Sequence, residues 1–276
     1  MKQLIYWRCF QSHKDWLTID GGLITDTLTQ KNENRISYQY ANGAVTVNLA
    51  TGTASGADGS DLLYNFNIVR GSAYNDTIYG SNSLLTPDIN EIFEGMGGND
   101  IIDGGDGYDM VSYKFNAATG VNVNLATGLV SNDGQGGADT LINIDGVQGT
   151  VFDDVLTGGN AINGTSVWDY QDNKQEWFRG DAGNDTINGG QGYDRADYQY
   201  SAAAVTVNLA AGTAQDGWGT TDNLVSIEGV RGSIYGDTLV GSDGAFESVV
   251  GSNVHGKFQF HIGAIRSSKF SSATVL

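Results

Sequence analysis

Short hydrophobic stretches alternate with polar residues along most of the chain. Val45, Val47 and Leu49 occupy every second position of one such stretch, and this period of two predicts a strand with one buried face. The same alternation returns at 121–125 and 205–209. Shorter apolar runs, bounded by glycine and expected as three-residue strands, lie at 77–79, 155–157 and 238–240. The 3.6-residue period of an amphipathic helix does not occur in these stretches.

The hydrophobic stretches belong to an internal repeat of roughly eighty residues. The segment at 35–40 returns at 110–115 and 195–200, and the segment at 65–82 returns at 143–160 and 226–243. Strands this short cannot bury a face alone, but they bury a shared column when successive turns stack. The repeat therefore predicts an all-β fold, a parallel β-roll or β-solenoid built from glycine-rich turns and short strands.

Two stretches of the repeat, 95–113 and 180–198, each contain two nine-residue units. Each unit has glycine at its first and fourth positions, aspartate at the sixth, and an apolar or small residue at the eighth. Glycine permits tight backbone curvature and the close approach of carbonyl groups. A glycine bend that is followed by aspartate and a short strand thus predicts an ion-binding turn. The units begin at Gly95, Gly104, Gly180 and Gly189.

These units resemble the hemolysin-type calcium-binding, or RTX, nonapeptide G-G-x-G-x-D-x-(apolar)-x. The unit at 104–112 matches at every key position, and the unit at 189–197 departs only at Ala196. Those at 95–103 and 180–188 lack only the second glycine. The resemblance covers residues 35–250. Degenerate units, with an aromatic residue in place of the fourth-position glycine, begin at Gly71, Gly149 and Gly232.

The resemblance implies a parallel β-roll in which Ca2+ binds between turns stacked along one edge. Sixth-position carboxylates and glycine-loop carbonyls would form the all-oxygen shell that this hard cation prefers. The candidate carboxylate ligands are Asp100, Asp109, Asp185 and Asp194, with Asp76, Asp154 and Asp237 as a second tier. The candidate glycines are Gly95, Gly98, Gly104, Gly107, Gly180, Gly183, Gly189 and Gly192.

In such a roll successive units fall on opposite edges. A binding site therefore needs one unit and the next but one along the chain, which lie on the same edge. Because the well-formed units occur only in pairs, we expect the degenerate units to supply the neighbouring turns. This places Asp76 beside Asp100 and Asp154 beside Asp185. The segments 80–94 and 158–179 would then cover the opposite edge. The alternative for these aspartates is turn formation without a metal.

Other recurring polar residues have simpler interpretations. Asparagines at matched positions of the three strands predict a solvent-facing or ladder position of the solenoid, and these are Asn48, Asn124 and Asn208. Three further acids are interpreted as solvated loop charges, and these are Asp103, Asp106 and Asp197.

The charge balance of the chain favours cations as partners. Acidic residues outnumber basic ones by 32 to 14 among 276 residues, for a net charge of −18. Nucleic acid and anionic membrane surfaces would be repelled, and no apolar stretch is long enough for a membrane span. With 40 glycines and a single proline, the acidic chain is expected to be largely disordered without calcium.

The two ends of the chain differ from its middle. We expect an atypical N-terminal segment at 1–34, the solenoid at 35–250, and a tail at 251–276 that serves as a cap or secretion signal or reflects truncation. The lone Cys9 allows no internal disulfide. The apolar run at the start is too short for a secretory signal peptide. The resemblance to RTX repeats implies an extracellular protein, which would then be secreted without such a peptide, with type I secretion machinery as a candidate partner.

Catalytic signatures are absent from the sequence. Neither H-E-x-x-H nor G-x-S-x-G occurs, and His13, His255 and His261 lie outside the repeats. The sequence thus predicts a non-enzymatic, calcium-binding repeat protein that folds when Ca2+ binds and is part of a secreted bacterial protein. One alternative is an adhesive or surface-layer module with a cell-surface or glycan ligand. Another is the non-catalytic C-terminal fragment of an exported hydrolase.

Overall fold

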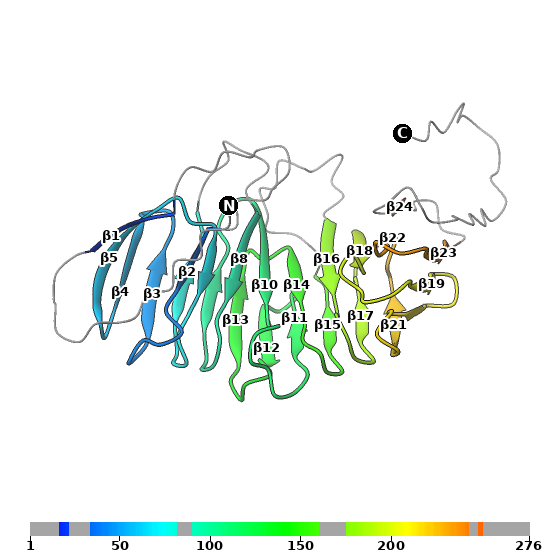
Figure 1. Cartoon of the computed structure of the whole chain (residues 1–276), viewed down its shortest axis with the longest axis horizontal. Coiled ribbons are helices and arrows are strands. Elements are labelled where there is room, and N and C mark those ends of the chain that lie inside the picture. Colours follow the sequence, from blue (N-terminus) through cyan, green and yellow to red (C-terminus); the bar gives the residue numbers. More distant parts are fainter. Residues whose placement is uncertain (1–16, 22–33, 82–89, 160–174, 243–247, 251–276) are drawn as a thin grey trace, which may run out of the picture.

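The computed structural model describes residues 17–21, 34–81, 90–159, 175–242 and 248–250. These residues form 24 strands and no helix, in two sheets of fifteen and nine strands. The coils stack in sequence order along the length of the molecule, as the colours of Figure 1 show. The all-β prediction of a parallel β-roll is therefore confirmed.

The nine-stranded sheet, called sheet A, consists only of parallel pairs. Each coil contributes one strand, and neighbouring strands in the sheet are neighbours along the solenoid. Its strands in order are β2 (Arg35–Ser37), β6 (Ile68–Arg70), β8 (Asn90–Glu94), β10 (Tyr108–Ser112), β14 (Gly146–Gln148), β16 (Gln175–Arg179), β18 (Tyr193–Asp197), β22 (Gly229–Arg231) and β24 (Ser248–Val250).

The fifteen-stranded sheet, called sheet B, mixes parallel and antiparallel pairs. Single strands from four coils are β7 (Thr77–Tyr79), β9 (Ile101–Asp103), β15 (Val155–Thr157) and β17 (Thr186–Asn188), and the last described coil adds β23 (Thr238–Val240). Three coils contribute triplets instead. These are β3 (Val45–Asn48), β4 (Thr53–Gly56) and β5 (Gly59–Tyr64); β11 (Asn122–Asn124), β12 (Leu129–Asn132) and β13 (Asp139–Ile142); and β19 (Thr206–Asn208), β20 (Thr213–Gln215) and β21 (Thr221–Val225).

Each triplet is an antiparallel excursion within one coil. In the second triplet β11 pairs with β15 of the following coil, whereas β13 pairs with β9 of the preceding coil. The chain therefore steps forward, reverses through β12 and returns. Each excursion adds two strands to sheet B and none to sheet A, which accounts for fifteen strands against nine.

The repeated asparagines close the first turn of each excursion. Asn124 Oδ1 accepts a hydrogen bond from Thr127 N–H at 3.1 Å, and Gly128 follows with φ of +67°, a backbone conformation that favours glycine. Asn48 and Asn208 accept equivalent bonds at 2.8 and 2.9 Å. The recurring Asn thus ends a strand and begins a hairpin, a role that the alternation of hydrophobic residues does not indicate.

The core is a single column of inward-facing side chains between the two sheets. Val45 and Val47 are buried and Thr46 is exposed, as the period of two predicts. Sheet A contributes Phe93 and Phe178, both fully buried. The predicted three-residue strands are β7, β15 and β23, each with its central residue buried. Each coil therefore adds one layer of hydrophobic contacts, in the manner of a solenoid.

Sheet B also extends into the first part of the chain. Strand β1 (Leu17–Asp20) pairs in parallel with β5, with Leu17 opposite Asp61, so a strand of the sheet precedes residue 35. Most of the N-terminal segment 1–34 and the whole tail 251–276 lie outside the described residues, and their predicted roles stay predictions. No helix long and apolar enough to cross a membrane occurs in the described part of the chain.

Candidate metal centre

The sixth-position carboxylate of each unit folds back over the first glycine of the same unit. A methyl group at Gly95 would lie 2.2 Å from Asp100 Oδ2, and one at Gly180 would lie 1.8 Å from Asp185 Oδ2. Corresponding distances at Gly104 and Gly189 are 2.8 Å to Asp109 Oδ2 and 2.7 Å to Asp194 Oδ2. Any side chain at the first position would collide with the carboxylate, which explains why glycine begins every unit.

The second and fourth positions of the well-formed units share a left-handed backbone. The fourth-position glycines Gly98, Gly107, Gly183 and Gly192 have φ of +117°, +135°, +126° and +133°. In the two units that lack a second glycine, Met96 and Asp181 adopt φ of +79° and +67°. The turn therefore keeps its shape despite these substitutions, at some cost in backbone strain.

Sixth-position aspartates form a ladder along the first edge, where the chain passes from sheet A to sheet B. Asp76 N–H donates to Asp100 Oδ1 at 2.8 Å, and Asp154 N–H donates to Asp185 Oδ1 at 2.9 Å. The degenerate units therefore lie directly beside the well-formed ones, as the spacing of units predicts.

The ladder continues into the excursions, through acids that the sequence analysis missed. Asp100 N–H donates to Asp139 Oδ1 at 2.9 Å, and Asp185 N–H donates to Asp222 Oδ1 at 3.1 Å. A repeated D-G-x-G-x-x-D pattern at 133–139 and 216–222 could have indicated these residues. Its first aspartate, Asp133, is fully buried, and its charge acts on Asp100.

Acids from different coils also meet along the second edge, where the chain returns from sheet B to sheet A. Glu91 on β8 is the parallel partner of Asp109 on β10, and Glu176 on β16 is that of Asp194 on β18. Glu176 N–H donates to Asp194 Oδ1 at 3.2 Å. Both glutamates come from the segments expected to cover this edge. Each stands eighteen residues, or two nonapeptides, before its aspartate, a signal that the sequence analysis did not use.

Backbone carbonyl groups approach the carboxylates of the second edge. A methyl group at Gly80 would lie 1.9 Å from Gly104 O and 2.6 Å from Glu91 Oε2. One at Gly158 would lie 2.0 Å from Gly189 O and 2.4 Å from Glu176 Oε2. In both repeats, therefore, a glycine-loop carbonyl and a carboxylate of another coil point at the same small region.

Several of these buried carboxylate oxygens lack a hydrogen-bond donor. Within the described parts of the chain Asp100 Oδ2, Asp185 Oδ2, Asp194 Oδ2 and both oxygens of Asp109 accept no hydrogen bond of good geometry, although the Glu91 backbone N–H lies near the Asp109 carboxylate. Burial removes water from such an oxygen, and the loss is costly unless a donor or a cation replaces it. These orphaned oxygens are the strongest sign that the four well-formed units are built to hold a cation.

The raised pKa values of the four aspartates also show that burial of their charged forms is unfavourable. Burial, with further contributions from nearby acids, raises the pKa of Asp100 to about 8 and that of Asp109 to about 9. Asp185 and Asp194 are raised to about 8 for the same reasons. Their main acidic neighbours are Asp139 and Glu91 in the first repeat, and Asp222 and Glu176 in the second. A charged state of these clusters therefore needs compensating positive charge.

Degenerate units satisfy their aspartates with hydroxyl groups instead. In the first of them Ser72 Oγ donates to Asp76 Oδ1 at 2.7 Å, and Val45 N–H donates to the same oxygen at 2.8 Å. Ser72 N–H donates to Asp76 Oδ2. Thr150 makes the equivalent bonds to Asp154 at 2.7 and 2.9 Å. Both aspartates thus have the bonding of a turn-forming residue.

A side-chain hydroxyl group at the fifth position also distinguishes the two D-G-x-G-x-x-D loops. In the second loop Thr220 Oγ1 donates to Asp216 Oδ2. Gly137 stands at the equivalent position of the first loop, and Asp133 Oδ2 has no donor among the residues that the structure describes. Hydroxyl capping therefore varies between repeats that are otherwise closely similar.

The donor set suits calcium only if backbone carbonyls take part. No group of three or more His, Cys, Asp or Glu side chains in the described residues is arranged to hold a metal by itself. Calcium takes six to eight oxygen ligands and accepts carbonyl groups among them. Carboxylates and glycine-loop carbonyls that converge at both edges are consistent with such a shell.

The fold and its edges define a β-solenoid whose turns are lined with buried carboxylates. The family model of the RTX calcium-binding nonapeptide repeat matches four copies, at residues 65–83, 89–112 and 176–196. The chain thus contains RTX-type nonapeptide repeats, as the sequence predicts, and RTX nonapeptides bind Ca2+. Asp154 and Asp237 lie outside the matched residues. A search of curated proteins gave no match.

One interpretation of an acidic residue is wrong. Asp197 is not a solvated loop charge, because it ends β18 and its side chain is only 2 % exposed. Three arginines from neighbouring positions of sheet A surround it. Its place in the strand, rather than its place after a glycine loop, decides its environment.

Proposed function

We propose that the chain is a calcium-dependent folding module of an exported protein. The observation that carries this proposal is the contrast between orphaned carboxylate oxygens in the well-formed units and hydroxyl-capped ones in the degenerate units. RTX repeats bind calcium as a family. The finer assignment of residues is our own.

We assign the carboxylate ligands to both edges of the roll. Asp100 and Asp133 would serve the first edge in the first repeat, with Asp185 in the second. Asp109 with Glu91, and Asp194 with Glu176, would serve the second edge. Carbonyls of the candidate glycine loops would complete each shell. Asp76 and Asp154, whose oxygens already accept hydrogen bonds, would have a structural part.

Folding would then be coupled to the ion. Bound Ca2+ supplies the positive charge that lets neighbouring carboxylates lie together. Without it, repulsion among these acids keeps the chain extended, a state that suits export. Extracellular calcium-binding modules have affinities of about 10⁻⁴–10⁻³ M, and the stability of the fold rises with the free ion concentration by mass action.

The cellular setting belongs to the same proposal. RTX repeat proteins are generally extracellular, and we propose secretion of this chain without an N-terminal signal peptide, through type I machinery. RTX repeats are typically non-catalytic, and we propose a non-catalytic role here also. An adhesive or surface-layer role is a second candidate, because cationic and aromatic side chains gather on the outer face of sheet A.

A calcium titration of the full chain tests the proposed function. We expect a coil-like circular dichroism spectrum in chelator and a β spectrum once calcium is added, with saturable heat in isothermal titration. Magnesium at the same concentration should not replace calcium, since it demands near-octahedral geometry and keeps its waters. A spectrum that is the same with and without calcium, together with no bound ion, would refute the proposal.

A further inference from the structure

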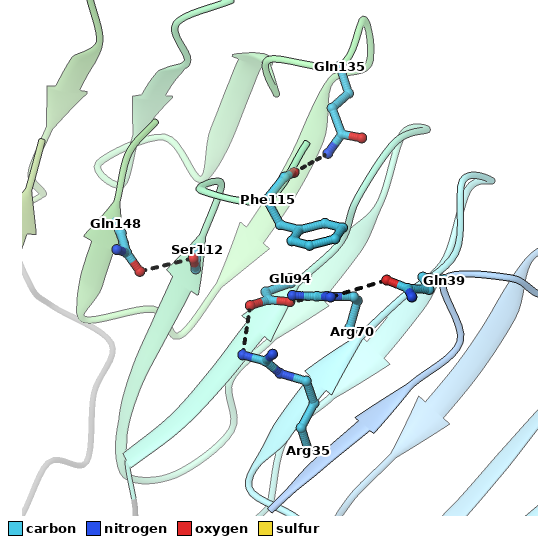
Figure 2. A network of polar contacts seen from close by, with 8 residues as sticks. All are labelled: Arg35, Gln39, Arg70, Glu94, Ser112, Phe115, Gln135 and Gln148. Atoms are coloured by element: carbon cyan, nitrogen blue, oxygen red, sulfur yellow. Dashed lines mark hydrogen bonds and ion pairs between the residues drawn. The ribbon is translucent and has the colours of Figure 1, made fainter. Parts of the chain in front are cut away.

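The outer face of sheet A carries two clusters of arginines, and in the first only Arg35 Nε lacks an acceptor among the described residues. Arg70 Nε and Arg35 Nη2 both donate to the carboxylate of Glu94, the latter at 3.2 Å. Arg70 Nη1 also donates to Gln39 Oε1 at 3.1 Å. Figure 2 shows these bonds, with the Phe115 ring stacked over the Arg70 guanidinium at 3.7 Å. This cluster has a structural role.

The second cluster has three arginines around one carboxylate. Nη2 of Arg179, Nη2 of Arg195 and Nη1 of Arg231 lie 3.5, 3.8 and 3.7 Å from Asp197 Oδ2. These separations allow ion pairing but are too long for good hydrogen bonds. Asp197 can neutralise only one of the three positive charges. The cluster is therefore a cationic spot on a chain whose net charge is −18.

Donor groups of this second cluster are left without acceptors. Among the residues that the structure describes, Arg179 Nε, Arg195 Nε and Arg195 Nη2 have no hydrogen-bond partner. The Arg231 side chain is 28 % exposed. Tyr200 is 60 % exposed, and the Arg179 guanidinium lies 4.5 Å from its ring centroid. These three nitrogen atoms are buried, so the accessible parts of the cluster are Arg231 and the Tyr200 ring.

The solenoid itself does not require these charges. In the preceding repeat, the positions of Arg179, Arg195, Asp197 and Arg231 are taken by Glu94, Met110, Ser112 and Gln148. There Ser112 Oγ donates to Gln148 Oε1 at 3.1 Å, as Figure 2 shows. A neutral pair thus takes the place of Asp197 and Arg231 in the same sheet, so the fold does not require these two charges.

We propose that Arg231, with the charges of the largely buried Arg179 and Arg195 behind it, binds the carboxylate of an acidic sugar residue, and that the Tyr200 ring is its stacking surface. Planar guanidinium groups match carboxylate oxygens in two-point hydrogen bonding. The exposed ring beside them favours a sugar over a simple anion. A long polyanion would meet the negative charge of the remaining chain, so the site suits a single acidic residue or a short acidic oligosaccharide. This site is separate from the calcium edges.

Binding is tested with the full chain in saturating calcium, by isothermal titration with a disaccharide that ends in glucuronic acid. Sodium acetate and the neutral glucose disaccharide are the comparison ligands. We expect saturable binding of the acidic disaccharide, with at least tenfold weaker binding of either comparison ligand. Equal binding of acetate would overturn the sugar assignment, and equal binding of the neutral disaccharide would overturn the role of the arginines.

Variants separate the arginine cluster from general surface charge. Arg231→Gln should weaken binding roughly tenfold, because one charge-assisted contact is lost. Lys114→Gln removes a cation whose side chain is 55 % exposed and which pairs with Asp181, so it should leave binding unchanged. Equal affinity of Arg231→Gln and the parent chain would refute the site.

Removal of the Asp197 carboxylate should change the affinity for the disaccharide in the opposite direction. In Asp197→Asn the three guanidinium groups lose their own anion, and binding of the disaccharide should tighten severalfold. A purely structural arginine cluster would show no such gain. Because this variant could fold poorly, Tyr200→Ala provides a second measurement. It should abolish the preference for the acidic disaccharide over acetate, and a retained preference would contradict the proposal.

Discussion

Asp76 and Asp100 are neighbours in one ladder, but their carboxylates differ in the hydrogen bonds that they accept. Both are 1 % exposed, and Asp76 N–H donates to Asp100 Oδ1. Asp76 accepts hydrogen bonds from Ser72, whereas Met96 at the equivalent position offers no hydroxyl, and Asp100 Oδ2 has no donor in the described residues. The same turn can thus be stabilised by its own hydroxyl or by an external cation. Burial of an aspartate alone does not identify a ligand.

The largest effect is expected where the orphaned oxygens are removed. Asp100→Ala combined with Asp185→Ala should lower the number of bound calcium ions and abolish or strongly weaken calcium-induced folding, measured by isothermal titration and circular dichroism. The matched pair Asp76→Ala with Asp154→Ala should lower thermal stability, by about 1–3 kcal/mol for each lost set of hydrogen bonds, at unchanged ion count. An unchanged number of bound calcium ions in the first pair of variants would contradict the assignment of Asp100 and Asp185 as ligands.

The pH dependence of the metal-free chain should follow the raised pKa values. A carboxyl group titrates near pH 4 in the unfolded chain, but burial raises the pKa of Asp100 to about 8 and of Asp109 to about 9 in the fold. Between these values the folded state binds more protons, so its stability falls as pH rises. In chelator, circular dichroism should therefore show more β structure at pH 5 than at pH 8. The reverse order would contradict the buried carboxylate clusters.

Glu91 tests the second edge separately. Glu91→Gln keeps the size of the side chain but removes the charge beside Asp109, and should raise the calcium concentration at the folding midpoint by roughly tenfold. Asp58→Asn is a suitable control, because Asp58 is an exposed acid between β4 and β5 and is not among the proposed ligands. If both variants shift the midpoint equally, the effect is one of net charge and not of a ligand.

The smallest effect is expected from the hydroxyl cap of the second loop. Thr220→Ala removes the hydroxyl that donates to Asp216 Oδ2 and makes this aspartate resemble Asp133. Calcium affinity should rise severalfold while metal-free stability falls by about 1–2 kcal/mol. Thr221→Ala, at the adjacent exposed position, should change neither. A parallel loss of affinity and stability in Thr220→Ala would mean that the hydroxyl supports the site.

Much of the architecture was predictable from local patterns. The alternation at 45–49 predicted which valines are buried, and the three-residue strands were found at 77–79, 155–157 and 238–240. The antiparallel excursions were not predicted, although Asn124 and Gly128 mark the turn that begins one. A turn residue shows where a chain reverses, but the strand that it then pairs with depends on the neighbouring coil.

The sequence by itself determined the nine-residue unit of this protein. Its first glycine leaves space for a carboxylate, further glycines occupy positions with a left-handed backbone, and an aspartate precedes a short strand. Steric and backbone rules act within nine residues and can be read from the chain. Only the tertiary structure decided which oxygens meet. Glu91 lies beside Asp109, and Asp139 beside Asp100, because the register between stacked coils sets these contacts. That register depends on packing across the whole solenoid, and no single unit contains it.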